Sequence, residues 1–148
     1  MGILSRFIKK PDSKKPWYSP GLRFECQQCG NCCGGGPGYV WLLEDDIARI
    51  SAFLDVPQDK FRRLFCRDVN GKISLIERSN YDCIFLTSEG CRIYPVRPHQ
   101  CRTFPFWPHI LRSKRRWRSV KERCPGIGKG EVYTEDEIKA ILAGVRPT

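Results

Sequence analysis

Residues 26–33, Cys26-Gln27-Gln28-Cys29-Gly30-Asn31-Cys32-Cys33, place four thiols within eight consecutive positions. A hydrophobic core has no packing reason for such a run. Two residues between cysteines let a chain wrap around one metal centre and present both sulfurs to it, as in zinc knuckles and ferredoxins. The adjacent Cys32 and Cys33 are harder to direct at a single ion, so we expect them to serve two metal positions, or one of them to be a bystander. The stretch predicts a metal-binding loop.

The other cysteines lie downstream of this loop. The chain has nine cysteines in 148 residues, and a flexible turn, residues 34–38, follows the opening run. Setting Cys66 aside leaves the predicted metal ligands: Cys26, Cys29, Cys32, Cys33, Cys83, Cys91, Cys101 and Cys124. Eight thiols are the number required for two four-ligand sites of zinc or iron–sulfur type. Cys26, Cys29 and Cys32 with the remote Cys124-Pro125 follow the spacing of a [4Fe-4S] ferredoxin site, which leaves the other four for a second site.

Several nearby residues have simpler interpretations than metal ligation. Cys66 follows an apolar helix face, where a free cysteine behaves as a small hydrophobe. His99 lies two residues before Cys101 and is an alternative ligand, although a lone histidine is more often a surface or hydrogen-bonding residue. The aromatic residues around position 105 are expected to shield the metal site or fill the core.

The cysteine count also bears on the compartment. A secreted protein with so many cysteines would form disulfides, yet the amino terminus has no continuous apolar run of the length that a signal peptide needs. An odd number of cysteines would leave one thiol outside any disulfide framework. No stretch approaches the roughly 18 consecutive apolar residues of a membrane span. We therefore expect a cytoplasmic protein whose thiols bind metal.

Composition predicts short and irregular elements. The chain holds 11 prolines and 13 glycines, which favour turns over long helices and strands. The even scatter of apolar residues gives no sign of two separate cores. We predict a small irregular α+β fold, a metal-stabilised, cysteine-rich single domain with few short helices and strands. Its expected divisions are a basic flexible tail over 1–19, a cysteine-cluster metal-binding domain over 20–130, and a C-terminal capping helix and tail over 131–148.

Hydrophobic spacing predicts the individual elements. Acidic residues at 44–46 open a helix whose apolar face carries Ile47, Ile50, Phe53 and Leu54. A second helix starts near Pro57 and buries Phe61, Leu64 and Phe65. Residues 39–42, 73–77 and 83–86 are strand-like, and 90–108 is irregular because of its prolines. Thr134 and Glu137 form the capping box of a last helix, which Gly144 closes.

Two basic segments suggest partners other than a metal. Within residues 1–10, apolar and basic side chains would occupy opposite helix faces, a pattern typical of weak membrane-surface contact. The net charge of +10 and the basic residues of 112–123 around Trp117 suggest a zinc-stabilised nucleic-acid-binding module. We do not favour this alternative, because a charge run is usually a solvated face and no zinc-finger helix follows the cysteines. Residues 112–123 are instead expected to run as a turn or strand pair that docks an acidic protein partner or offsets thiolate charge.

The cysteine blocks resemble a known family. Phe24-x-Cys26-x-x-Cys29-Gly30-x-Cys32-Cys33 is similar to the opening signature of the bacterial CxxCxxCC proteins, also called the YkgJ family of cysteine-cluster proteins. The second block is similar at Cys83-x-Phe85-Leu86, Cys91-x-Ile93-Tyr94, Arg97-Pro98, Cys101-Arg102 and Phe104-Pro105-Phe106, and the closing element at Cys124-Pro125-Gly126-Ile127-Gly128-x-Gly130. The resemblance covers residues 22–130 and implies a zinc- or iron-chelating domain. It departs at Leu43, where the family has a small hydroxyl residue before the first helix.

The resemblance leaves the reaction open. A flagellin lysine methylase carries a related cysteine-rich segment, which implies a protein-modifying enzyme as an alternative. This chain shows no glycine-rich nucleotide loop and no catalytic constellation, so methylase activity is not carried over. The leading hypothesis is a metal or iron–sulfur protein that transfers electrons, senses redox state or donates metal, with Arg97 and Arg102 hydrogen-bonded to ligand sulfurs. In a simpler version of this hypothesis, the metal only stabilises a small fold.

Overall fold

The computed structural model of the protein describes residues 14–144, so the membrane-surface contact expected from residues 1–10 lies outside the described residues. The strands are β1 (Leu22–Phe24), β2 (Cys66–Val69), β3 (Lys72–Leu75), β4 (Leu86–Thr87), β5 (Gly90–Cys91) and β6 (Ile127–Tyr133). The helices are α1 (Glu44–Phe53), α2 (Gln58–Phe65), α3 (His99–Thr103), α4 (Pro108–Leu111), α5 (Lys114–Val120) and α6 (Glu135–Leu142), with the 3-10 turns η1 (Asn31–Cys33) and η2 (Tyr94–Val96). These short elements confirm the predicted α+β class.

The strands form separate antiparallel pairs rather than one sheet: β1 with β6, β2 with β3, and β4 with β5. The β1–β6 pair joins the two ends of the described chain, with Leu22 opposite Tyr133. The strand expected over 73–77 is confirmed in part as β3. Over 83–86 the structure differs, because Cys83 forms only an isolated bridge to Glu77 and β4 begins at Leu86.

The first and last helices agree with their sequence signals. In α1 the Oδ2 atom of Asp46 accepts the Leu43 N–H at 2.9 Å, so a carboxylate of the first turn satisfies the helix end that Leu43 cannot cap. In α6 the predicted capping box is present, since Thr134 accepts the Glu137 N–H and the Glu137 side chain accepts the Thr134 N–H. The backbone of Gly144, at φ 81°, ends the helix.

Three local expectations are wrong. Phe53 and Leu64, expected in the core, are 47% and 50% exposed, because α1 ends at Phe53 and the short α2 buries only the side of the helix that carries Phe61. Residues 112–123 form no strand pair: they contain α5, whose first turn Ser113 caps by accepting the Arg116 N–H, and Lys and Arg are good helix formers. The segment 90–108 is not wholly irregular, since it includes β5, η2 and α3.

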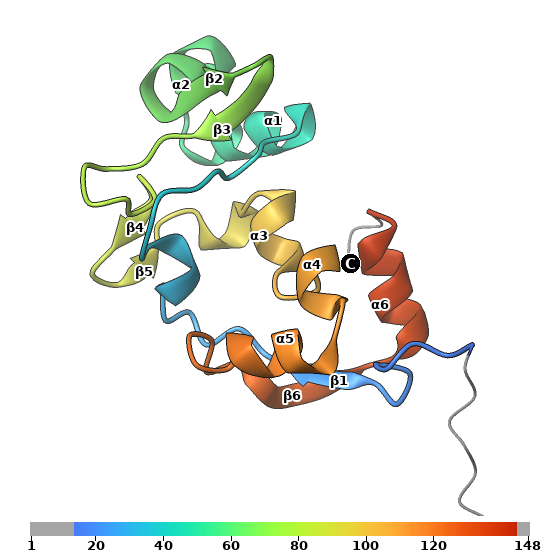
Figure 1. The fold of residues 1–148 in the computed structure, drawn as a ribbon. Coiled ribbons are helices and arrows are strands. Elements are labelled where there is room, and N and C mark those ends of the chain that lie inside the picture. The colour runs from blue at the N-terminus through green and yellow to red at the C-terminus, as the bar shows by residue number, and fades with distance from the viewer. Residues whose placement is uncertain (1–13, 145–148) are drawn as a thin grey trace, which may run out of the picture.

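The buried apolar side chains form two clusters, where the sequence suggested one. The first core consists of Ile47, Ile50, Phe61, Leu75, Phe85 and Ile93. The second core consists of Phe106, Ile110, Leu111, Trp117, Ile127, Ile138 and Ile141. Figure 1 shows the elements of the first core, α1, α2, β2 and β3, grouped apart from α4, α5, α6 and the β1–β6 pair.

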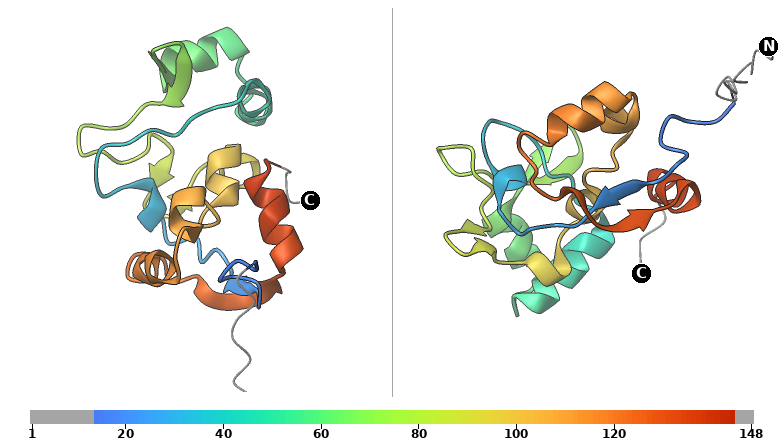
Figure 2. Two further views of the ribbon diagram at one scale, coloured as in Figure 1. Left: turned by 45° about the vertical axis from the view of Figure 1, so that its right-hand side comes forward. Right: turned by 90° about the horizontal axis from the view of Figure 1, so that it is seen from below.

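The chain passes between the two cores in two places. The chain contributes to the second core up to Phe24 and again from Phe104 onward. Between these positions, from Val40 to Val96, it contributes to the first core. The connecting segments are therefore 25–39 and 97–103, and Figure 2 shows the first of them as a light-blue trace that includes the short turn η1. Both segments contain cysteines. No helix among residues 14–144 has the length and apolar character needed to span a bilayer.

Candidate metal centre

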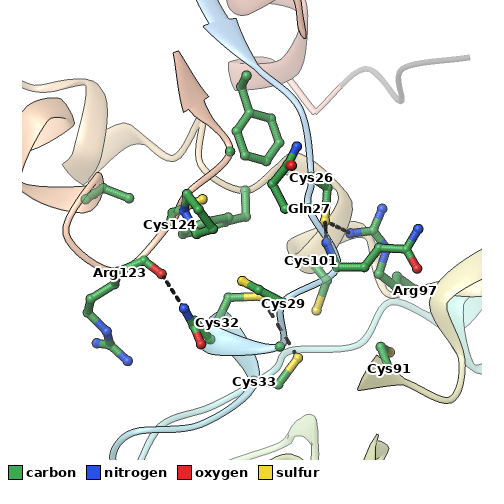
Figure 3. Close-up of a pocket in the computed structure, with 18 of the residues that line it drawn as sticks. Cys26, Gln27, Cys29, Cys32, Cys33, Cys91, Arg97, Cys101, Arg123 and Cys124 are labelled. Carbon is green, nitrogen blue, oxygen red and sulfur yellow. Dashed lines mark hydrogen bonds between the residues drawn. The ribbon is translucent and has the colours of Figure 1, made fainter. Parts of the chain in front are cut away.

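A pocket of about 290 Å³ lies where the connecting segments meet. Seven of the eight predicted ligands line this cysteine pocket, namely Cys26, Cys29, Cys32, Cys33, Cys91, Cys101 and Cys124. Figure 3 shows the sulfurs of Cys29, Cys32 and Cys33 close together, with Cys101 nearby from a separate helix. Thiols that are up to 98 positions apart in the sequence therefore face one hollow.

The opening loop wraps tightly because two of its glycines lie against other segments. Gly30 has φ 75°, a left-handed conformation that glycine adopts without strain, and it precedes η1 with Cys32 and Cys33. A Cβ atom on Gly34 would collide with the Asp82 side-chain oxygen, so a larger residue there would require the Asp82 carboxylate to move. The loop also holds Cys83, whose N–H donates to the Cys33 carbonyl at 2.7 Å.

Cys91 and Cys101 reach the pocket on two different elements. Cys91 lies in β5, opposite Leu86 of β4, at the end of a two-stranded hairpin packed on the first core. Cys101 lies in α3. The Oδ1 atom of Asp46 accepts the N–H of His99, the first residue of α3, at 3.0 Å and so fixes this helix. The first core therefore sets the position of both thiols.

Cys124 approaches from the second core. The Glu25 N–H donates to the Gly126 carbonyl at 3.1 Å, and a Cβ atom on Gly126 would lie 2.2 Å from the Glu25 carbonyl oxygen. The absence of a side chain at Gly126 therefore lets the closing element lie against the opening loop. The Asn31 side chain adds a second link by donating to the Arg123 carbonyl at 3.0 Å.

The adjacent Cys32 and Cys33 share a proton. Their sulfurs are 4.0 Å apart, and the hydrogen bond from Cys33 lowers the pKa of Cys32 to about 6, helped by the positive charges of Arg97 and Arg123. The same hydrogen bond, with burial, raises the pKa of Cys33. At neutral pH one thiolate of the pair is thus available as a metal ligand.

Crowding opposes further ionisation in the pocket. Burial is the main cause that raises the pKa values of Cys83, Cys91, Cys101 and Cys124, and neighbouring thiolates raise them further. A bound cation reverses this effect because it stabilises several thiolates at once. The donor set thus fits zinc or an iron–sulfur centre, both of which prefer thiolate sulfur.

The thiols are gathered but not yet directed at one point. Within residues 14–144, no three cysteine, histidine, aspartate or glutamate side chains already surround a single ion position. Metal binding would therefore require the cysteine sulfurs to move closer together, and rotation about a Cα–Cβ bond is one way in which a sulfur changes position.

Other predicted residues lie elsewhere. Cys66, at the start of β2, packs against the first core and does not line the cysteine pocket, in agreement with its interpretation as a small hydrophobe. His99 is likewise absent from the pocket lining. The Nη1 atom of Arg97 lies 3.9 Å from the Cys26 sulfur, a long contact but in the expected direction, whereas Arg102 does not line this pocket.

Arg123 and Tyr94, neither of them predicted as a metal ligand, also belong to the site. Arg123 lines the pocket and its Nη2 atom donates to the Gly34 carbonyl at 3.1 Å. Tyr94 also lines it, and burial with a hydrogen bond to Cys26 raises the pKa of its phenol. Arg123 belongs to the basic segment 112–123 that was expected to offset thiolate charge, and its charge does lower the pKa of Cys32; Tyr94 lies three positions after Cys91.

Comparison with known proteins finds relatives of this chain. An uncharacterized protein of Methanocaldococcus jannaschii, MJ0661, is 30% identical over 95 residues, which are 63% of this chain and 50% of that protein. The chain thus spans about half the length of this relative. No solved structure matches.

The sequence profile of one family covers the whole cysteine region. This profile, CxxCxxCC, carries the description "putative zinc- or iron-chelating domain" and matches residues 25–125. The matched range begins one residue before Cys26 and ends one residue after Cys124, so it contains every cysteine of the pocket. As the match spans more than half of the 148 residues, the chain belongs to the CxxCxxCC family.

Proposed function

We propose that this protein binds zinc or an iron–sulfur centre in the cysteine pocket, for a role in redox chemistry or metal handling. The proposed ligands are Cys26, Cys29, Cys32, Cys33, Cys91, Cys101 and Cys124, which line the pocket, and Cys83, which does not line it but donates its N–H to the Cys33 carbonyl. The observation that carries the proposal is the convergence of cysteines from separate segments on one hollow, while Cys66 stays in an apolar core. An iron–sulfur centre would supply electron transfer, and zinc would supply a structural link or a metal to donate.

The electrostatic neighbours of each thiol agree only in part with a division into two ligand sets. Charges on Cys29 and Cys32 raise the pKa of Cys124, as expected if these three belong to a [4Fe-4S]-type site with Cys26. Beyond the hydrogen bond between Cys32 and Cys33, burial and charges on Cys32, Cys83 and Cys91 raise the pKa values of both Cys33 and Cys101, so Cys32 adjoins the other four as well. Cys26 fits less well, because its charge acts on Cys91 instead.

The alternative functions gain less support. A nucleic-acid-binding role was suggested by basic residues around an aromatic side chain, but Trp117 is only 7% exposed and belongs to the second core. It is therefore not placed to stack on a base. A protein-modifying activity rests on resemblance to the flagellin lysine methylase alone.

Metal analysis of protein purified without oxygen tests the proposal. We expect bound metal, with brown colour and broad visible absorbance for iron–sulfur and no colour for zinc. Cys29→Ser and Cys101→Ser should lower the metal content, and the matched control Cys66→Ser should not. Equal loss in all three variants, or metal-free protein from every preparation, would refute the assignment.

A further inference from the structure

A second hollow opens beside the cysteine pocket. This side groove has a volume of about 750 Å³, within the range of small-molecule sites. It is lined by parts of β1, η2, α3, β6 and α6 and of the segments that adjoin them. The side chains that line both hollows are Phe24, Cys26, Tyr94, Arg97 and Phe104. The groove and the cysteine pocket therefore share a wall that includes a proposed metal ligand.

The groove carries opposite charges on different segments. Arg97 and Arg102 come from the segment between η2 and the end of α3. Glu25 directly follows β1, Glu131 lies in β6 and Glu137 lies in α6. A ligand that contacts both sets needs a negative and a positive group of its own.

Arg97 is held in place but has no carboxylate partner among residues 14–144. Its guanidinium carbon lies 3.9 Å from the centre of the Tyr94 ring, and its Nε atom donates to the Tyr94 carbonyl at 3.2 Å. A guanidinium restrained in this way loses little entropy when it binds an anion. The remaining donors of Arg97 suit a ligand carboxylate.

The acidic side chains differ in their availability. Glu137 caps α6, since its Oε2 atom accepts the Thr134 N–H at 2.7 Å. Glu25 and Glu131 are exposed and form no ion pair within residues 14–144. These two carboxylates suit an ammonium group and repel ligands that carry several negative charges.

We propose that the side groove binds a small zwitterionic, peptide-like molecule, such as an apolar amino acid or a dipeptide. Its carboxylate pairs with Arg97, its ammonium group lies toward Glu25 and Glu131, and its apolar side chain packs on Phe104 and Ile141. This binding site goes beyond the proposed metal function and does not require a metal. Cys26, in the shared wall, would place the ligand beside the metal centre.

Three related probes test the charge requirement on the full-length protein as purified. Glycyl-phenylalanine carries both charges, its N-acetyl form lacks the ammonium group, and its amide lacks the carboxylate. Calorimetry should show the tightest binding for the unmodified dipeptide, with a loss of about two- to fivefold for each capped form, the range for one exposed ion pair. Equal affinity for all three, or no binding of any, would overturn the proposal.

Variants locate the site. Glu131→Gln should reduce the preference for the free amine over the N-acetyl form, because only Glu25 then remains, whereas Glu89→Gln, at an exposed carboxylate outside the groove, should keep it. Ala140→Trp should fill the groove and remove binding, with Ala143→Trp as the control on the same helix end; thermal unfolding checks that both variants fold. Unchanged binding in Glu131→Gln and Ala140→Trp would place the ligand elsewhere. Metal content is measured in parallel, so loss of one proposal leaves the other standing.

Discussion

The two cores differ in how much of the chain each requires. All members of the first core lie between Ile47 and Ile93, so its contacts are local along the sequence. The second core needs β1, near the start of the chain, to return to β6 near its end. Long-range pairing costs more loop entropy than local contacts do. We therefore expect the first core to depend less than the second on the connecting segments that carry the cysteines.

Removing the metal should have the largest effect on the difference in stability between the two cores. If thiolates from both connecting segments bind one centre, the metal ties the cores together with a free energy that for small zinc domains is about 10–16 kcal/mol. Treatment with a chelator should lower amide-exchange protection in β1 and β6 by roughly 100-fold more than in α1, because the first core is local. Hydrogen exchange followed by mass spectrometry measures this difference.

Adding metal back is the control for that experiment. Protection in β1 and β6 should return without any change in α1. Uniform loss of protection across both cores would show that the cores do not depend differently on the connecting segments.

Gly126→Ala should weaken the junction of β1 and β6 without touching a cysteine. Its Cβ atom would lie 2.2 Å from the Glu25 carbonyl oxygen, and because that neighbour is backbone, relief requires the strands to separate. Overpacking of this kind costs about 1–3 kcal/mol of unfolding free energy, measurable by urea denaturation. Gly38→Ala is the matched control, since the nearest atom to its Cβ is the Glu77 carboxylate at 4.0 Å. Similar losses in the two variants would contradict the packing argument.

Asp46→Asn should act on the other connecting segment, at a smaller scale. Asp46 is fully buried and accepts from the N–H groups of Leu43 and His99 and from the Arg49 side chain. The amide keeps the shape but loses the charge that pairs with Arg49. Since Arg49 is 29% exposed, we expect a loss of about 1–2 kcal/mol rather than the full cost of a buried pair.

Chemical denaturation also distinguishes Asp46 from an ordinary surface carboxylate. The control is Glu44→Gln, which removes the ion pair of an exposed glutamate with Arg62. It should cost less than about 1 kcal/mol. If Asp46→Asn were equally mild, α3 would not depend on Asp46 for its position.

The sequence predicted what depends on near neighbours along the chain. The cysteine spacing at 26–33 and the capping box at Thr134 and Glu137 are local signals, and the family match and α6 agree with them. The division into two cores could not be predicted, because an even scatter of apolar residues does not reveal which of them will meet. The burial of Trp117 could not be predicted for the same reason, because it results from the packing of α5 on the second core.

The candidate site shows the same difference between local and long-range features. Spacing selected eight cysteines, because ligands cluster where the chain wraps a centre; seven of them line the pocket and Cys83 does not, and which of them bind metal stays a prediction. The side groove had no signal, since Glu25, Arg97 and Glu131 are brought together only by the β1–β6 pairing and the return of α3.

The smallest predicted effect concerns Cys66, the cysteine of the first core. Burial raises the pKa of its thiol from 9.0 to about 11. Below about pH 9 the folded and unfolded chains both hold this proton, so Cys66 adds no pH dependence. Between about pH 9 and 11 the unfolded chain releases the proton first, which favours unfolding, and stability is lost as pH rises.

Comparison with Cys66→Ser isolates this contribution, because serine does not titrate in the same range. Urea denaturation of metal-loaded protein at about pH 8 and about pH 10.5 should show a slightly larger loss of unfolding free energy in the wild type than in the variant. The difference should be small, since the thiol is only partly buried. If the variant lost more stability than the wild type, Cys66 would be a thiolate in the folded protein, as a metal ligand is. Cys66 would then belong with the cysteines of the pocket rather than with the first core.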